Sequence, residues 1–119
     1  MDLWEVDKDL IEDWYSKLDS GSRAQVEAAL RLLQAVGPRL GRPLVDSVVG
    51  SVHANMKELR PGSTGRSELR ILFVFDPTRK AIMLVAGDKT GLWNKWYRTN
   101  IRKADQLYTK HLEKLRQGN

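Results

Sequence analysis

The order of apolar patterns along the chain predicts one α+β domain spanning residues 1–119, with an N-terminal helical hairpin packed on a small twisted, mainly antiparallel sheet and a C-terminal helix. Apolar residues recur at helical spacing over the first third of the chain and again near its C-terminal end. The middle of the chain instead holds continuous apolar runs separated by turn residues. A length of 119 residues fits a single domain.

The N-terminal third predicts a short strand and two helices. Leucine, tryptophan and valine make residues 3–6 a candidate strand. Apolar residues over 10–18 form the buried stripe of a first helix, which the Asp-Ser-Gly sequence at 19–21 ends. Ser22, with glutamine three residues later, fits the capping box of a second helix, which Gly-Pro at 37–38 ends. We expect this hairpin to bury the aromatic side chains of Trp4, Trp14 and Tyr15.

The middle of the chain predicts the sheet. Residues 37–50 have the composition of a loop that runs into a strand, and residues 48–49 with 56–60 form one long strand or two short ones. The clearest strand is the run Leu-Arg-Ile-Leu-Phe-Val-Phe at 69–75. Turn residues then lead into a second apolar run at 81–86, so the two runs predict a β-hairpin.

A basic, aromatic-rich segment separates this hairpin from the last helix. We expect residues 87–100 to form a loop, and Thr99 or Asn100 to cap the helix that follows. His111 lies on the apolar side of that helix, and His53 lies in a strand-like stretch. A packed, hydrogen-bonded side chain is the favoured interpretation of both histidines.

Composition excludes several classes of function. The chain has no cysteine, which excludes disulfides, thiolate catalysis and Cys-ligated metal centres and fits a reducing cytoplasm. No apolar run approaches the ~18 residues of a membrane span, and the N-terminus lacks the order of a signal peptide. The histidines lack metal-ligand spacing, and neither a Gly-x-Ser-x-Gly elbow nor a phosphate-binding loop is present. We therefore expect a soluble, cytoplasmic protein that uses no metal, cofactor or membrane.

Charge is distributed unevenly along the chain. Lysine and arginine number 20 against 15 aspartates and glutamates, a net charge of +5. Residues 1–56 hold 6 basic and 9 acidic side chains, whereas residues 57–119 hold 14 basic and 6 acidic ones. A basic half attracts polyanions, of which nucleic acid is the usual one, although a solvated surface that serves solubility explains the charge equally well.

Five basic residues accompany the predicted strands. Lys57 and Arg60 precede a Pro-Gly loop, Arg66 lies in that loop, and Arg70 and Lys89 flank the predicted hairpin. They can converge near one sheet edge, although the odd spacing of Lys57 and Arg60 places these two on opposite faces unless a bulge or strand end intervenes. Such cations suit metal-free RNA cleavage, in which the 2′-hydroxyl attacks phosphorus and fixed positive charge stabilises the transition state. Solvated strand edges are the commoner role.

The segment 89–98 holds three aromatic residues and three cations within ten positions. Unpaired bases stack on aromatic faces, and cations follow the phosphate backbone. Lys95 and Arg98, with Arg66, are therefore candidate RNA-binding residues. Trp93 and Trp96 either stack on bases or pack against the core, and the sequence leaves both alternatives open.

Several segments in a consistent order resemble the RelE/HigB superfamily of toxins from type II toxin–antitoxin systems. The Lys-Glu-Leu-Arg sequence at 57–60, the run at 69–75 and the segment at 81–89 carry the resemblance. Residues 40–45 and the Trp14-containing helix are similar to the HigB-like, phage-derived branch. The resemblance covers nearly the whole chain.

This resemblance implies a compact fold of the RelE type and a metal-independent endoribonuclease that cleaves mRNA, typically on the ribosome. It also implies inhibition by a cognate antitoxin, often a helix-turn-helix protein. By position, Arg60, Arg70 and Lys89 match the basic active-site strands of the family best, and Lys57 comes next. Many members place a catalytic His or Tyr near the C-terminus, where the proton-transfer candidates here are Tyr108 and His111.

Two alternatives to a toxin endoribonuclease, or mRNA interferase, remain. A non-catalytic RNA- or ribosome-binding module would bind RNA with a steep salt dependence and yield no cleaved product. A regulatory protein-interaction domain would use its basic half to bind an acidic partner and would show little affinity for RNA at moderate salt.

Overall fold

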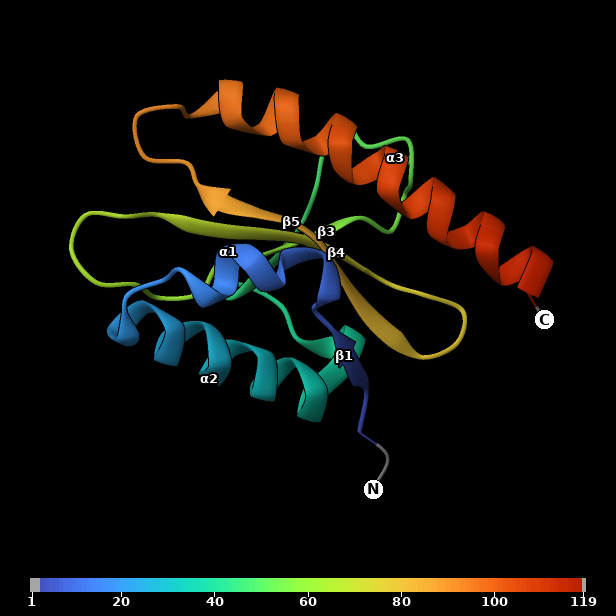
Figure 1. Cartoon of the computed structure of the whole chain (residues 1–119), viewed down its shortest axis with the longest axis horizontal. Helices are drawn as coiled ribbons and strands as arrows, with labels where there is room; N and C mark the ends of the chain where they lie inside the picture. Colours follow the sequence, from blue (N-terminus) through green and yellow to red (C-terminus); the bar gives the residue numbers. More distant parts are fainter. Residues whose placement is uncertain (1–2, 119) are drawn as a thin grey trace.

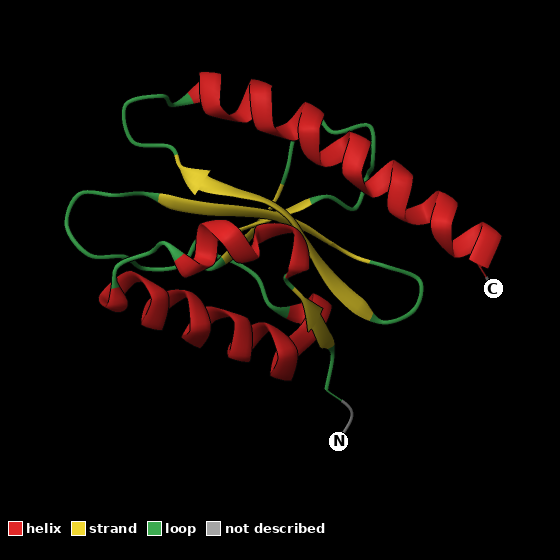
Figure 2. Ribbon diagram, viewed as in Figure 1, coloured by secondary structure: helices red, strands yellow, loops and turns green. Residues whose placement is uncertain are grey.

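A five-stranded sheet separates two helical layers in the computed structural model, which describes residues 3–118 (Figure 1). The strand order is β1-β5-β4-β3-β2, with β1 parallel to β5 and every other pair antiparallel. Helices α1 and α2 cover one face and α3 covers the other (Figure 2), so the predicted α+β class is confirmed. The elements are β1 (Glu5–Asp7), η1 (Asp9–Ile11), α1 (Glu12–Ser16), α2 (Ser20–Val36), η2 (Gly37–Arg39), β2 (Val45–Ser47), β3 (Lys57–Leu59), β4 (Leu69–Phe75), β5 (Lys80–Asp88) and α3 (Asn94–Gly118).

The central strand β4 is apolar along most of its length because both of its faces are buried. Ile71 and Phe73 pack into the core beneath α1 and α2, whereas Leu72 and Val74 pack into the core beneath α3. Alternate side chains of a strand point to opposite faces, so a strand covered on both sides needs apolar residues at successive positions. The predicted strand 69–75 and its hairpin with β5 are confirmed.

The second helix begins earlier than its sequence predicts. Asp19, rather than Ser22, is the N-cap, and its carboxylate accepts a hydrogen bond from the Ser22 amide at 3.0 Å. Ser22 instead lies buried in the first turn, where its hydroxyl is 3.2 Å from the Thr64 hydroxyl. The predicted end is confirmed, because Gly37 adopts a positive φ of 68° that disfavours any side chain.

Short elements account for the other differences at the N-terminal end and in the predicted loop. The first strand spans Glu5–Asp7 rather than 3–6, and the first helix is divided into η1 and α1. Strand β2 lies inside the predicted loop and pairs with β3, whereas residues 48–49 lie outside any strand. A three-residue strand depends on pairing with its neighbour, which local sequence does not encode.

Helix α3 begins at Asn94, within the segment predicted to be a loop. The sequence predicts a loop here because the segment is basic and rich in aromatic residues. In the structure the irregular backbone ends just before the helix, where Gly91 and Trp93 adopt positive φ angles. Trp96 is 5% exposed and packs beneath the helix, so tertiary contact stabilises a first turn of low intrinsic propensity. Within residues 3–118 no helix is long and apolar enough to cross a membrane.

Candidate active site

Arg60, Arg70 and Lys89 lie on the face of the sheet that α3 covers. Arg70 is two residues before Leu72, whose side chain packs beneath α3. Glu58 pairs with Leu72, and Arg60 follows Glu58 by two residues. Lys89 lies two residues beyond the β5 partner of Arg70. Because side chains alternate between the faces, these registers bring all three cations to one side.

Carboxylates hold the two arginines in place. Arg60 Nη2 is 3.1 Å from Asp46 Oδ2 and 2.8 Å from Glu58 Oε2. Arg70 Nε lies 3.7 Å from the other oxygen of Glu58. Burial alone would lower the pKa of Arg60, but its hydrogen bond to Glu58 and the charges of Glu58 and Asp46 outweigh burial and raise that pKa above its usual value. The guanidinium of Arg60 therefore stays charged and oriented.

Glu68 connects Arg70 to Lys89. One oxygen, Glu68 Oε1, is 3.7 Å from Arg70 Nη2 and 3.4 Å from Lys89 Nζ. Lys89 is 8% exposed, and its ammonium lies 4.7 Å from the centre of the Trp93 ring and 5.9 Å from that of Tyr97. These distances fit cation–π contacts. Cations and carboxylates thus alternate across the sheet in a set that we call the ion-pair row: Asp46, Arg60, Glu58, Arg70, Glu68 and Lys89.

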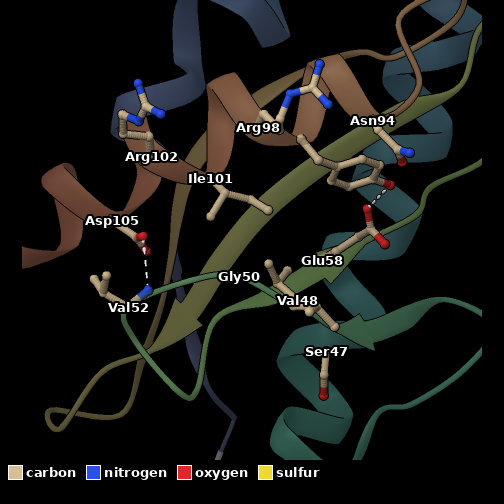
Figure 3. Close-up of a pocket in the computed structure, with 12 residues that line it drawn as sticks. Ser47, Val48, Gly50, Val52, Glu58, Asn94, Arg98, Ile101, Arg102 and Asp105 are labelled. Atoms are coloured by element: carbon tan, nitrogen blue, oxygen red, sulfur yellow. Dashed lines mark hydrogen bonds between the residues drawn. The ribbon is translucent and has the colours of Figure 1, made fainter.

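Tyr97, which the sequence analysis did not identify as a site residue, lies in the first turn of α3 and contacts this row. Its phenol donates a hydrogen bond to Glu58 Oε1 (Figure 3), and Glu58 is only 3% exposed. Burial raises the pKa of Tyr97, the bond to Glu58 raises it further, and nearby Arg70 opposes both only in part. The phenol therefore keeps its proton at neutral pH. The only indication of Tyr97 in the sequence is its place in the aromatic-rich segment. Because that segment was predicted to be a loop, the direction of the side chain could not be inferred.

Lys57 is not part of this cluster. It pairs with Phe73, whose side chain packs beneath α1 and α2, and it shares a face with Leu59 in the same core. Lys57 and Arg60 are an odd number of residues apart, so strand alternation places them on opposite faces of the sheet. Lys57 accordingly lies on the side of the sheet away from α3.

Trp96 and Trp93, for which the sequence left two alternatives open, differ in the structure. Trp96 is buried in the core, with its Nε1 only 2.8 Å from where a Cβ on Gly87 would lie. Trp93 is 62% exposed, and its one cation–π contact among the described residues is with Lys89. The other candidate RNA-binding residues are all exposed: Arg66, Lys95 and Arg98.

Tyr108 and His111 lie at the opposite end of the sheet from the ion-pair row. His111 Nε2 is 2.7 Å from Asp76, which directly follows the C-terminal end of β4, whereas Arg70 lies near its beginning. Tyr108 is 3% exposed and stacks on His111 at 6.0 Å. Along α3, Tyr97 and His111 are separated by about 21 Å at 1.5 Å per residue. The two predicted proton-transfer residues therefore do not meet the cations, and the favoured packed role of His111 fits its contacts.

A groove of about 640 Å³ adjoins the row between α3 and the loop after β2 (Figure 3). Glu58 and Tyr97 line it at the end nearest the row, and Val48 and Ile101 contribute apolar side chains. Asp105 accepts hydrogen bonds from the Ser51 hydroxyl and from the Val52 amide at 3.1 Å, and these bonds hold the loop against the helix. The described residues contain no group of three or more His, Cys, Asp or Glu side chains that could hold a metal ion.

Comparison with known proteins places the chain in a described family. Residues 13–109 match the family model for phage derived protein Gp49-like, so the chain is a member of the Gp49-like family. Membership confirms the resemblance to the phage-derived, HigB-like branch of the RelE/HigB superfamily, with which the observed α+β fold agrees.

Two relatives from Mycobacterium tuberculosis are named as candidate toxins. One, HigB2, is 54% identical over 109 residues, which cover 92% of this chain and 54% of the relative. The other, HigB3, is 51% identical over 96 residues, which cover 81% of this chain and 82% of the relative. The chain thus spans about half the length of HigB2 and most of HigB3. No solved structure matches the chain with significance.

Proposed function

We propose that this protein is the toxin of a type II toxin–antitoxin system and acts as a metal-independent endoribonuclease on mRNA. The names of its relatives support the first part of this proposal. The observation that carries the second is the convergence of Arg60, Arg70 and Lys89 on one face of the sheet, each held by a carboxylate. Fixed cations of this kind stabilise charge that develops on a phosphoryl group.

The proposed reaction needs no cofactor. The 2′-hydroxyl oxygen forms a bond to the adjacent phosphorus, the bond from phosphorus to the 5′-oxygen breaks, and the 2′-hydroxyl loses a proton while the 5′-oxygen gains one. Negative charge on the phosphoryl oxygens rises in the transition state. Arg60 and Arg70 clamp these oxygens, since a guanidinium can donate two parallel hydrogen bonds, and Lys89 adds charge.

Arg70 offers a specific donor for this step. Its Nε–H is buried and has no hydrogen-bond partner within residues 3–118. An unpaired buried donor is unfavourable, so a movement of neighbouring side chains that exposes this nitrogen to a phosphate oxygen would supply the acceptor that it lacks. A phosphate oxygen that reaches this nitrogen would share Arg70 with Glu58 and Glu68.

Tyr97 takes the proton-transfer role that the sequence had suggested for Tyr108 or His111. Its phenol is protonated, and it lies beside Glu58 and Arg70 rather than at the far end of the sheet. A neutral phenol can donate its proton to the departing 5′-oxygen, and general acid catalysis of this kind contributes about 10²–10⁴-fold in rate. Glu58 is the positioning residue that orients Tyr97, Arg60 and Arg70.

The surroundings of the row support binding of a single RNA strand. Trp93 presents an exposed ring for stacking, and Arg66, Lys95 and Arg98 offer exposed positive charge for phosphates. We extend the proposal to a cytoplasmic protein that acts on mRNA at the ribosome. A cognate antitoxin with a helix-turn-helix domain would be its inhibitor.

Primer extension on translated and untranslated RNA tests this function. After induction of the protein, we expect discrete cut sites on translated messages and arrested growth. The Arg70→Ala variant should lose both, because it removes a buried cation on which the proposed clamp depends. Intact messages and unchanged growth, with soluble wild-type protein present, would contradict the proposal.

The ion pairs also favour one alternative, an RNA- or ribosome-binding module without catalysis. The row contains equal numbers of positive and negative side chains, so its charges are compensated before RNA arrives. In that case the protein would bind RNA tightly at low salt, and primer extension would find no new ends.

A further inference from the structure

The positive charge that attracts RNA must come from outside the ion-pair row. Within the row each cation is paired with a carboxylate. Four exposed cations instead follow one another along the N-terminal half of α3, and none of them forms an ion pair within residues 3–118: Lys95, Arg98, Arg102 and Lys103.

Two of these cations, Arg98 and Arg102, belong to the groove of about 640 Å³ (Figure 3). They lie one helical turn apart, so their guanidiniums rise from the same stretch of α3 along its rim. Ile101 lies between them in sequence and reaches into the groove toward Val48 on the facing loop. The groove thus combines an apolar interior with two unpaired arginines at its edge.

The groove is continuous with the candidate active site. Glu58 and Tyr97, which hydrogen-bond to each other beside Arg60 and Arg70, both line it. A strand of RNA whose phosphate lies at the ion-pair row can therefore continue directly into this groove on one side of that phosphate. Its volume is within the roughly 300–1,000 Å³ typical of sites for small organic ligands, which fits a nucleotide unit rather than a duplex.

We propose that this groove is the binding site for the nucleotides that flank the cleaved phosphate, an inference that rests on the proposed function. Arg98 and Arg102 bind the flanking phosphates at the rim, and an unpaired base lies against Ile101 and Val48. Asp105 holds the opposite wall in place through Ser51 and Val52. The groove accepts single-stranded RNA, because a base enters it only when unpaired.

Fluorescence anisotropy with a labelled single-stranded RNA tests the groove. The Arg70→Ala background keeps the probe intact. Each phosphate contact on a single strand contributes about 0.7 to the slope of log affinity against log salt. The Arg98→Ala/Arg102→Ala variant should therefore bind more weakly at low salt and lose about 1.4 from that slope. The matched control is Arg31→Ala/Arg39→Ala, which removes two exposed arginines from the other side of the sheet and should retain the slope.

A second variant examines the loop wall without disturbing the core. Val49 is 91% exposed and lines the groove, so Val49→Asp should leave folding intact and weaken RNA binding by placing negative charge beside the phosphates. An unchanged slope in the double-arginine variant, or an equal loss in the control, would overturn the proposal. The exposed Val49 would then be better explained as a contact with another protein.

The binding experiment can distinguish a failure of the groove assignment from a failure of the proposed nuclease function. If wild-type protein binds RNA through the groove yet produces no cut ends, the groove assignment stands and the nuclease assignment fails. If wild-type protein cleaves RNA but the groove variants bind it normally, the nuclease assignment stands and the groove assignment fails.

Discussion

At the scale of single residues, Glu58 explains why distant parts of the chain meet at one site. It is a buried carboxylate that accepts hydrogen bonds from Arg60 and Tyr97 and lies 3.7 Å from Arg70. A charge in such a place is stable only when several partners compensate it. The same partners are the residues that a phosphate would need, so the carboxylate that orients these side chains also prearranges the candidate site.

Replacing Tyr97 by phenylalanine separates its proton-transfer role from packing. The ring remains, while the donor to Glu58 is lost. We expect the rate of RNA cleavage to fall by about 10²–10⁴-fold, the usual contribution of a general acid. Because the lost bond is to a buried, charged carboxylate, the free energy of unfolding should fall by about 1.5–3 kcal/mol, which is still compatible with a folded protein.

Tyr108→Phe is the matched control, because Tyr108 is a buried tyrosine of the same helix at the far end of the sheet. Single-turnover cleavage of a defined RNA measures both variants. Equal losses in the two would remove Tyr97 from the reaction.

At the scale of elements, the C-terminal half of α3 is attached to the β4–β5 turn through Asp76. Its carboxylate accepts bonds from His111, from the amide and hydroxyl of Thr78 and from the Lys80 amide. Burial alone would raise the pKa of Asp76, but these bonds outweigh burial and hold the pKa below its ordinary value. The turn and the helix are therefore joined by an ionised aspartate.

The lowered pKa of Asp76 predicts acid sensitivity. A carboxyl whose pKa is lower in the folded than in the unfolded state contributes stability above its ordinary pKa, and this stability is lost as pH falls toward the folded value. Asp19 acts in the same direction, since the Ser22 amide and hydroxyl and Thr64 lower its pKa to about 2. Urea midpoints should fall as pH drops below about 4. In Asp76→Asn this fall should be smaller; an unchanged pH profile would contradict the role of Asp76.

Elements differ in how far the sequence predicts them. Strand β4 is predictable because burial on both faces leaves an apolar run with clear ends. The start of α3 is not, since it depends on Trp96 packing against residues far away in the chain. This error also hid Tyr97, because a residue in an expected loop has no predictable direction. Strand alternation, by contrast, correctly warned that Lys57 and Arg60 face opposite sides.

At the scale of the whole molecule, the sheet divides the protein into two unlike layers. The half that forms α1 and α2 is acidic in balance, whereas the half that contains β3 to α3 carries 14 basic and 6 acidic side chains. The exposed cations of this half include four on the N-terminal half of α3, so we expect a polyanion such as RNA to approach the protein from that layer.

The same architecture predicts which parts of the molecule open first. Amide hydrogen exchange should be slowest in β4 and β5, which form the centre of the sheet and are covered on both faces. It should be fastest in the loop of residues 48–55, where Val49 and Val52 are strongly exposed. Exchange in β4 as fast as in that loop would contradict a core formed on both sides of the strand.

The most direct test of the account compares two cations on opposite faces of neighbouring strands. The rate of RNA cleavage is measured in a ribosome-containing translation reaction for Arg70→Ala and Lys57→Ala. We predict that Arg70→Ala lowers the rate about 10²–10³-fold, as loss of one preorganised donor to a developing anion does, while Lys57→Ala cleaves at nearly the wild-type rate. A fully active Arg70→Ala variant, folded as judged by its circular dichroism spectrum, would contradict the central claim that the ion-pair row stabilises the reacting phosphate.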